Sequence, residues 1–555
     1  MRSVLAFAFT LCISATLAVK VTFTNKHYFY FDVDGNAIDS TNGKVEWVRD
    51  QYFWIGEPDS CGAAICDKIS YSSPDLINWF YNGPLFNLTT NMNVCSGFGS
   101  CSRPKVVYNE KTKKYVLYGF ASVTGGPPGI PVFTSDQLTK GYTFAGRMIP
   151  DYHPSGYGVE DLGLAVIDGK GYVTWTGFNL TAVFTQPPPG NIWPPFIQTV
   201  LVQELTPDFL NGAGKAYPVV EAGGDFPVTP TSKNLVDGQV ESPDLFKRGD
   251  YYYMVGSGTC AFCAGTITLA YRSKSPFGPW KRQIVDSNNT CGGQAMGVMT
   301  VPSSSTSIQG NSYVYHADAF HTAPVGQHFT AAKGHGFWPI SFNHDGSIQK
   351  IDCSPSAKFT IDALPAVAKV PSTGRATKAA DGSGNYGDYW AETGLLTQRY
   401  LYQTWTSSAS GNLTEVGVNL ACNSPASNPM AITVFSYQDE KELIGPFLNW
   451  KILGSFILGQ TPGSVTPGFK VQRVPVNQAV RAGDKLGIAF TFPGPLVPQE
   501  LLPYAYLLQD TPRTATSHTL YELKRGHVSA DGLDASQSPL KEVKGKEMKW
   551  YATVV

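Results

Sequence analysis

The sequence is poor in charge and has no run of basic residues. Only 15% of its 555 residues are charged, and 42 Lys and Arg nearly balance 43 Asp and Glu. A nucleic-acid partner requires a basic patch or stripe, so this composition argues against one. Beyond the first residues, no stretch approaches the roughly 20 apolar residues that a membrane-spanning helix needs, which argues against a membrane partner.

Several catalytic signatures are also missing. The chain has no Walker loop, no His-Glu-x-x-His, no Gly-x-Ser-x-Gly and no paired Cys-x-x-Cys, which argues against the nucleotide, zinc-protease and serine-hydrolase sites that these motifs build. Four histidines and one aspartate are close together in sequence: His316, Asp318, His321, His328 and His335. A metal site there is conceivable, but the spacing matches no standard pattern, and we expect no metal and no cofactor.

Aromatic residues, glycine and proline are abundant. Aromatics make up 13% of the chain, with 28 Tyr and 11 Trp, and there are 56 Gly and 39 Pro. This profile is typical of many short strands joined by turns. Most of these aromatic rings will belong to a β-protein core, and the remainder are suited to stacking on a ligand such as a sugar.

The N-terminus has the pattern of a secretory signal. Met1–Ala18 combines a basic start at Arg2, an apolar centre and a small-residue cleavage site. Four sequons suit a secreted glycoprotein, and they lie at Asn87, Asn179, Asn288 and Asn412. We therefore expect residues 1–18 to be a signal peptide and the protein to be extracellular.

Nine cysteines remain once this signal is removed, and an oxidising compartment favours disulfides. The expected short-range pairs are Cys61–Cys66, Cys95–Cys101 and Cys260–Cys263. Cys291–Cys353 is a fourth, longer-range pair, and Cys422 is left over. Zinc binding or redox activity at Cys260-Ala-Phe-Cys263 is the less favoured interpretation, because the motif occurs once and has no histidine nearby.

A unit of strand, turn and aromatic strand recurs along the first two thirds of the chain. Its five copies begin near Gly43, Arg103, Asp161, Val240 and Gln294. Units repeating at roughly 50–80 residues are typical of propellers. An all-β fold with a five-bladed β-propeller over residues 19–356 therefore explains the repeats better than a β-sandwich does.

The pattern changes after this region. Residues 357–384 are rich in small residues and predict a linker. Residues 385–555 contain about seven separated strands without the blade signature, which predicts a β-sandwich accessory domain. That domain would either bind carbohydrate or simply pack on the propeller.

Acidic and amide side chains stand at the openings of the predicted blades. Glu241 opens blade four, Asp161 follows Glu160 in blade three, and Gln294 opens blade five. Singly, each acid before a strand is more often a turn residue or a surface charge. The innermost strands of a propeller bring their starts together, however, and hydrolysis of a glycosidic bond needs an acid and a second group that directs water or attacks carbon.

Blades one and two lack such an acid at their openings. Blade one opens with Asn42-Gly43, with Asp39 just upstream and Glu57 at the end of its second strand; blade two opens with Ser102-Arg103. We expect Asp39, Glu57, Ser102 and Arg103 on the substrate side of the site. Asp39 and Glu57 are also the candidates for assisting the attacking water, and the identity of the base stays open.

These motifs resemble glycoside hydrolase family 43, over about residues 25–355. The similar segments are Glu241–Arg248 with Tyr251–Tyr253, Glu160-Asp161 ahead of Asp168-Gly169, and Ser275–Trp280. Within the family, Cys291-Gly292-Gly293-Gln294 is similar to the exo-β-1,3-galactanase-like branch and its fungal relatives. The chain departs from that branch at Ser102, where the branch has Glu, and at Asn42, where it has His.

The resemblance implies a five-bladed propeller that hydrolyses with inversion. It implies that Glu241 is the general acid, that Asp161 orients it and modulates its pKa, and that Gln294 positions the water. The expected activity is a secreted, monomeric glycoside hydrolase acting on side chains of plant cell-wall polysaccharides, with galactan 1,3-β-galactosidase as one form. The alternatives are an α-L-arabinofuranosidase or β-xylosidase, and a carbohydrate-binding propeller without catalysis.

Overall fold

The computed structural model is built almost entirely of β-strands. It describes residues 18–24, 30–36, 38, 40–58, 67–95, 101–120, 129–152, 158–178, 198–220, 240–258, 267–286, 294–302, 311–319, 334–353, 358–366, 381–382, 389–392, 399–422, 430–439, 450–458, 468–491, 504–509, 519–524, 528–529, 532–533, 541–542, 546–548 and 550–555. Among these residues the one helical segment is a 3₁₀ turn, η2 (Thr89–Asn91). The all-β prediction is confirmed.

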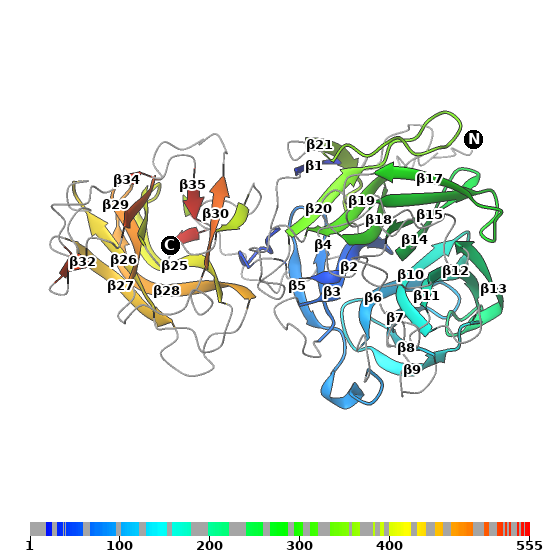
Figure 1. Cartoon of the computed structure of the whole chain (residues 1–555). Coiled ribbons are helices and arrows are strands. Elements are labelled where there is room, and N and C mark those ends of the chain that lie inside the picture. The colour runs from blue at the N-terminus through cyan, green and yellow to red at the C-terminus, as the bar shows by residue number, and fades with distance from the viewer. Residues whose placement is uncertain are drawn as a thin grey trace, which may run out of the picture.

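The first two thirds of the chain form five consecutive antiparallel sheets (Figure 1). The first contains β2 (Thr41–Val48), β3 (Gln51–Glu57), β4 (Ile69–Ser73) and β5 (Phe80–Pro84). The second contains β6 (Ser102–Asn109), β7 (Lys114–Phe120), β8 (Ile130–Ser135) and β9 (Thr143–Met148). The third contains β10 (Gly158–Ile167), β11 (Lys170–Phe178), β12 (Gln198–Leu205) and β13 (Gly212–Val220).

The fourth sheet contains β14 (Val240–Arg248), β15 (Tyr251–Gly258), β16 (Thr268–Ser273) and β17 (Lys281–Asp286). The fifth contains β18 (Gln294–Pro302), β19 (Asn311–Ala319) and β20 (Gly334–Pro339). The opening strands β2, β6, β10, β14 and β18 neighbour one another in that order, and β18 returns to β2. The five sheets therefore surround one axis, with their opening strands innermost.

A separate hydrophobic cluster fills each gap between neighbouring sheets. Phe53 and Leu117 meet between the first and second sheets, and Leu245 and Val202 meet between the fourth and third. The cluster between the fifth and first sheets includes Trp54 and Phe337, and it closes the ring. Burial of apolar surface at these five junctions is the main force that holds the sheets around the axis.

Two strands far apart in sequence pair over that last junction. β1 (Val19–Thr24) is antiparallel to β21 (Lys358–Ala363), and Val21, Phe23 and Ile361 join its cluster. β21 lies within residues 357–384, so the segment predicted as a linker begins with a strand that belongs to the first part of the molecule.

The last third of the chain forms two larger sheets that pack face to face. One contains β22 (Asp381–Gly382), β23 (Tyr389–Glu392), β25 (Gly411–Cys422), β28 (Gly468–Val480), β30 (Tyr504–Gln509), β35 (Lys546–Met548) and β36 (Trp550–Val554). The other contains β24 (Arg399–Thr406), β26 (Met430–Tyr437), β27 (Lys451–Leu458), β29 (Lys485–Thr491), β31 (Thr519–Lys524) and β34 (Lys541–Glu542). β32 (Val528–Ser529) and β33 (Gly532–Leu533) form a small hairpin.

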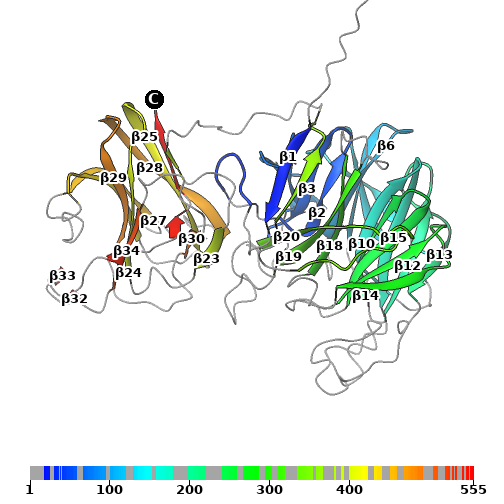
Figure 2. The ribbon, with the colours of Figure 1, turned by 90° about the horizontal axis from the view of Figure 1, so that it is seen from above.

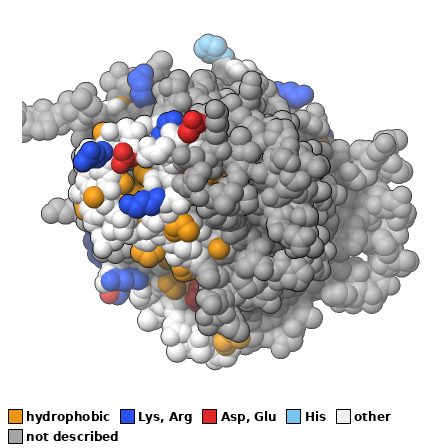
Figure 3. Space-filling view, turned by 90° about the vertical axis from the view of Figure 1, so that its left-hand side faces the viewer, with side chains coloured by type: hydrophobic (Ala, Val, Ile, Leu, Met, Phe, Trp, Pro, Cys, Tyr) orange, Lys and Arg blue, Asp and Glu red, His pale blue; other side chains and the backbone are white. Residues whose placement is uncertain are grey.

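Trp405, Val416, Ile432 and Trp550 form part of the core between these two sheets, which lie beside the ring of five in Figures 1 and 2. Where the two parts meet, the Val471 amide donates to Asn36 Oδ1 at 3.0 Å. On the side shown in Figure 3, charged and hydrophobic side chains of the described residues are interspersed. No helix in the described part of the chain is long and apolar enough to cross a membrane.

One predicted disulfide, Cys95–Cys101, is confirmed. Cys353 is also disulfide-bonded, but its partner lies outside the described residues. The predicted partner Cys291 lies there too, as do both members of Cys61–Cys66 and of Cys260–Cys263. Those pairings stay predictions.

Candidate active site

The five innermost strands share an irregularity near their starts. The pairing register with the second strand shifts between Thr41 and Lys44, Ser102 and Lys105, Glu160 and Leu162, Glu241 and Asp244, and Ala295 and Gly297. A β-bulge re-aims the side chains beside it. Because the five strands surround one axis, the bulges turn the residues at these openings toward a common space.

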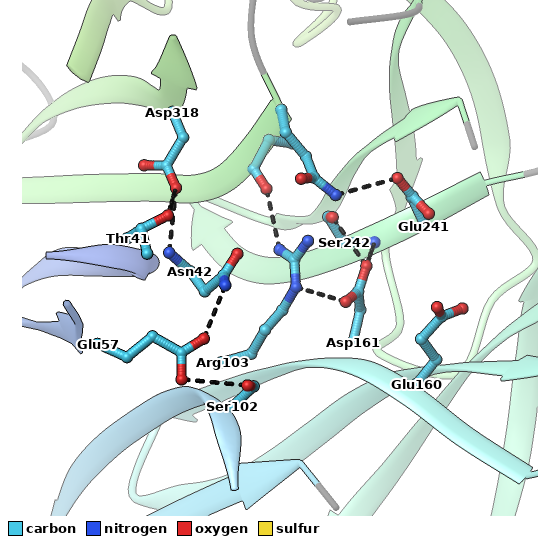
Figure 4. A network of polar contacts seen from close by, with 12 residues as sticks. Thr41, Asn42, Glu57, Ser102, Arg103, Glu160, Asp161, Glu241, Ser242 and Asp318 are labelled. Atoms are coloured by element: carbon cyan, nitrogen blue, oxygen red, sulfur yellow. Dashed lines mark hydrogen bonds and ion pairs between the residues drawn. The ribbon is translucent and has the colours of Figure 1, made fainter. Parts of the chain in front are cut away.

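Three of the bulged residues adopt a backbone conformation that non-glycine residues avoid. The φ angles are 58° at Asn42, 51° at Arg103 and 56° at Ser242. Such residues cost of order 1–3 kcal/mol each and persist where their surroundings fix them. All three belong to the polar network shown in Figure 4.

Glu241 is a buried carboxyl group in contact with Gln294. Its side chain is 3% exposed, and Gln294 Nε2 donates to Glu241 Oε1 at 3.2 Å (Figure 4). Gln294 Oε1 has no hydrogen-bond partner among the described residues. The amide therefore presents an acceptor beside the Glu241 carboxyl group.

Asp161 contacts Ser242, the residue after Glu241, and is linked through Arg103 to the residue after Gln294. Its Oδ2 accepts hydrogen bonds from the Ser242 backbone amide at 3.0 Å and from Ser242 Oγ at 2.9 Å. Its Oδ1 forms an ion pair with Arg103 Nε, and Arg103 Nη1 donates to the Ala295 carbonyl at 3.2 Å. Asp161 thus fixes the residue that follows Glu241, while Arg103 balances its charge and links the second sheet to the fifth.

Glu57 is held by three donors from three different strands or loops. Asn42 Nδ2 donates at 2.7 Å, Lys68 Nζ at 2.5 Å and Ser102 Oγ at 3.1 Å. Lys68 is fully buried, so its charge and that of Glu57 compensate each other. The predicted residues Glu57, Ser102 and Arg103 therefore line the same network, whereas Asp39 lies outside the described residues.

Glu160, the residue before Asp161, has a pKa well above the ordinary value of a glutamate. Nothing in the sequence indicates this shift. Burial raises the pKa of Glu160 to about 8, and the charge of Asp161 acts in the same direction. Gln198 Nε2 donates to Glu160 Oε2 at 3.3 Å. This shift favours the protonated form of the carboxyl group near neutral pH.

A second charged layer lies further along the same strands, and sequence reasoning missed it. Lys44 Nζ contacts both carboxylate oxygens of Asp244, at 2.8 and 2.9 Å, and the Val298 amide donates to Asp244 Oδ2 at 2.8 Å. Burial, together with the nearby charge of Lys44, lowers the pKa of Lys105 to about 8. The last residues of the innermost strands, at the opposite end from Glu241, line a cavity of about 850 Å³.

No family model and no curated protein matches the chain. Solved structures do show similarity. An exo-β-1,3-galactanase from Phanerochaete chrysosporium with galactose has 17% identity and a TM-score of 0.45, covering 85% of this chain and 96% of that one.

An exo-β-1,3-galactanase from Clostridium thermocellum has 19% identity and a TM-score of 0.45, covering 96% of this chain and 100% of the other. A family 43 arabinoxylan arabinofuranohydrolase from Bacillus subtilis has 17% identity and a TM-score of 0.42, covering 96% of each chain. Values this low assign no activity to the present chain. The solved structures similar to it nevertheless include glycoside hydrolases of family 43, the family that its sequence motifs resemble.

Proposed function

We propose that this protein is a secreted, inverting glycoside hydrolase of family 43. In this proposal residues 1–18 are the signal peptide and the five sheets of residues 19–356, with β21, are the blades of a catalytic propeller. The part of residues 357–384 between β21 and β22 is a linker, and β22 with residues 385–555 forms a β-sandwich accessory domain. The cleaved bonds are O-glycosidic bonds in side chains of plant cell-wall polysaccharides.

The contact between Glu241 and Gln294 carries this proposal. Glu241 is a buried carboxyl group at an open strand end, which suits an acid that protonates a leaving oxygen. Gln294 Nε2 donates to Glu241, and Gln294 Oε1, which has no hydrogen-bond partner among the described residues, accepts from the attacking water. Inversion needs these two functions on opposite sides of the sugar, in groups about 6.5–9.5 Å apart. In this proposal the 3.2 Å contact between Gln294 and Glu241 therefore opens when the sugar enters the site.

Asp161 and Glu57 support this pair without reacting themselves. The ion pair between Asp161 and Arg103 and the two hydrogen bonds from Ser242 favour an orienting role for Asp161, which fixes the backbone that carries Glu241. Both oxygens of Glu57 are engaged by donors, so we assign it to holding Asn42 and Ser102 in place on the substrate side.

β-1,3-Galactan is the substrate that we propose first, because of the resemblance around Gln294. Ser102 and Asn42 depart from the galactanase-like pattern, and for this reason arabinofuranosidase or xylosidase activity is the second candidate. A carbohydrate-binding propeller without catalysis is the third, since no carboxylate base has been found among the described residues of the network.

The test measures sugar release from β-1,3-galactan, arabinogalactan, arabinan and arabinoxylan. Glu241→Gln keeps the shape of the side chain but removes the transferable proton, and we expect it to lower kcat by about 10²–10⁴-fold. The matched control is Glu110→Gln, whose side chain is 73% exposed. Inversion is checked by NMR of the anomer released first. Near-normal activity of Glu241→Gln would exclude this acid, and binding without release on all four substrates would establish the non-catalytic alternative.

A further inference from the structure

Three buried side chains with metal-binding atoms converge at the junction of the fifth and first sheets. His316 and Asp318 lie on β19 and His335 lies on β20, and their exposed fractions are 0%, 0% and 1%. One ligand atom from each lies within 4.8 Å of the other two. Imidazole nitrogen and carboxylate oxygen are among the ligands that Zn²⁺ takes in proteins.

Two of the three separations between these atoms match those of ligands around one ion. His316 Nε2 is 3.4 Å from His335 Nδ1, and His335 Nδ1 is 3.3 Å from Asp318 Oδ1. With bonds of about 2.0–2.1 Å in a tetrahedral arrangement, two ligand atoms are about 3.3–3.4 Å apart. Direct hydrogen bonds from nitrogen to oxygen are usually shorter, about 2.7–3.2 Å.

The outward-facing atoms of His335 and Asp318 are also engaged, whereas His316 Nδ1 has no hydrogen-bond partner among the described residues. His335 Nε2 lies 3.4 Å from the Ile38 carbonyl, which can only accept, so Nε2–H is the donor of this contact and Nδ1 faces the cluster. Asp318 Oδ2 accepts from Thr41 Oγ1 at 2.5 Å and from the Asn42 amide at 3.0 Å. Metal-ligating histidines and carboxylates are typically oriented by such outer contacts.

Aromatic rings enclose the cluster and fix the two imidazoles. Phe337 stacks on His316 with ring centroids 4.4 Å apart and an interplanar angle of 12°. Trp54 meets His335 edge to face, at 4.6 Å between centroids. The ligand atoms are therefore preorganised in an apolar environment, where an ion is held without competition from bulk water.

We propose that His316, Asp318 and His335 bind a divalent transition-metal ion of the zinc type. The ion would fasten Asp318, and through it Thr41 and Asn42 at the start of β2, so that it ties the last sheet of the ring to the first. The spacing in sequence did not predict this site, because His335 lies 19 residues from His316. The proposal does not depend on the hydrolase activity.

The experiment uses the purified full chain after removal of metal with a chelator. Zn²⁺ is titrated in competition with a chromophoric chelator, and bound metal is measured by mass spectrometry after dialysis. Co²⁺ is added in parallel, because its visible absorption reports a tetrahedral environment. The variants are His335→Gln and Asp318→Asn. The control is His344→Gln, at an exposed histidine outside the cluster.

We expect one equivalent of metal and a tetrahedral Co²⁺ spectrum in the wild type and in His344→Gln, and loss of both in the two ligand variants. Thr41→Val, which removes an outer contact of Asp318, should weaken Zn²⁺ binding by about 10–100-fold. If His335→Gln or Asp318→Asn does not fold, the Zn²⁺ affinity of Thr41→Val tests the proposal instead. Absence of retained metal in the wild type, or unchanged affinity in His335→Gln, Asp318→Asn or Thr41→Val, would overturn the proposal.

Discussion

The buried pair of Lys44 and Asp244 gives a direct test of the residues that support the site. Removing Asp244 leaves the buried Lys44 ammonium with only its longer, 3.4 Å contact to Glu46, and breaking a buried ion pair typically costs about 3–5 kcal/mol. We therefore expect Asp244→Asn to lower the free energy of unfolding by that amount in urea denaturation. Asp136→Asn, at a carboxylate that is 77% exposed, is the control and should be nearly neutral. Equal free energies of unfolding for the two variants would show that Asp244 is not needed to compensate the buried charge of Lys44.

The raised pKa of Glu160 predicts a pH-dependent change in stability. With a folded pKa of about 8 against an ordinary value of 4.5, the folded state binds the extra proton between these pH values. Rising pH then favours the unfolded state, and the penalty is complete above about pH 8. Glu160→Gln removes this penalty, so its Tm should exceed that of the wild type at pH 9, and the gain should shrink toward pH 5. A gain that does not vary with pH would contradict the assignment.

A site residue can be predicted from the sequence when the residues next to it form a recognisable motif. Glu241, Asp161 and Gln294 were predicted as site residues because each stands near the start of a recognisable strand, and the structure brings Glu241 into contact with Gln294. Lys44 and Asp244 were missed because 200 residues separate them, and a buried ion pair of that kind leaves no local pattern. The protonation of Glu160 was missed for the same reason, since burial by the folded chain is its main cause.

At the level of elements, the bulges at the openings of the strands determine where the site residues point. Asn42 has a φ of 58°, which alanine tolerates less well than glycine by about 1–2 kcal/mol. Both Asn42→Ala and Asn42→Gly lose the hydrogen bond to Glu57, so the difference between them isolates the backbone conformation. We expect Asn42→Ala to be the less stable of the two by that amount in urea denaturation. Equal stability would show that the bulge relaxes without strain.

The strands and turns were largely predictable, whereas their irregularities were not. Asp168-Gly169 forms the expected turn, with φ of 52° and 78°, because aspartate and glycine both accept that conformation between two strands. The bulges at Asn42, Arg103 and Ser242 carry no such marker, since ordinary residues are forced into them by contacts across the ring. The partner of β1 was not predictable either, because nothing in β1 or β21 specifies so distant a partner.

For the whole molecule, the structure predicts where the first part of the chain can end. The Leu364 amide donates to the Pro302 carbonyl and the Ala366 amide to the Pro74 carbonyl, so the chain remains attached through residue 366. A chain of residues 19–366 should keep both the Tm of the ring and the hydrolysis rate. A chain ending at residue 356 lacks β21 and uncovers Val21 and Phe23, each of which contributes about 1.5–3 kcal/mol when buried. Its Tm in calorimetry should fall by several degrees, and equal Tm values would contradict the structural role of β21.

The pairing of β1 with β21 also bears on the order of events during synthesis. Thr22 and Thr360 face each other across this sheet, although 338 residues separate them. At about 5–20 residues per second, β1 leaves the ribosome roughly 20–70 s before its partner exists. Throughout that interval the edge of β1 is exposed and able to pair with other chains. The ring is thus completed only when about two thirds of the chain has been made, and β1, its first strand, waits until then for its native neighbour.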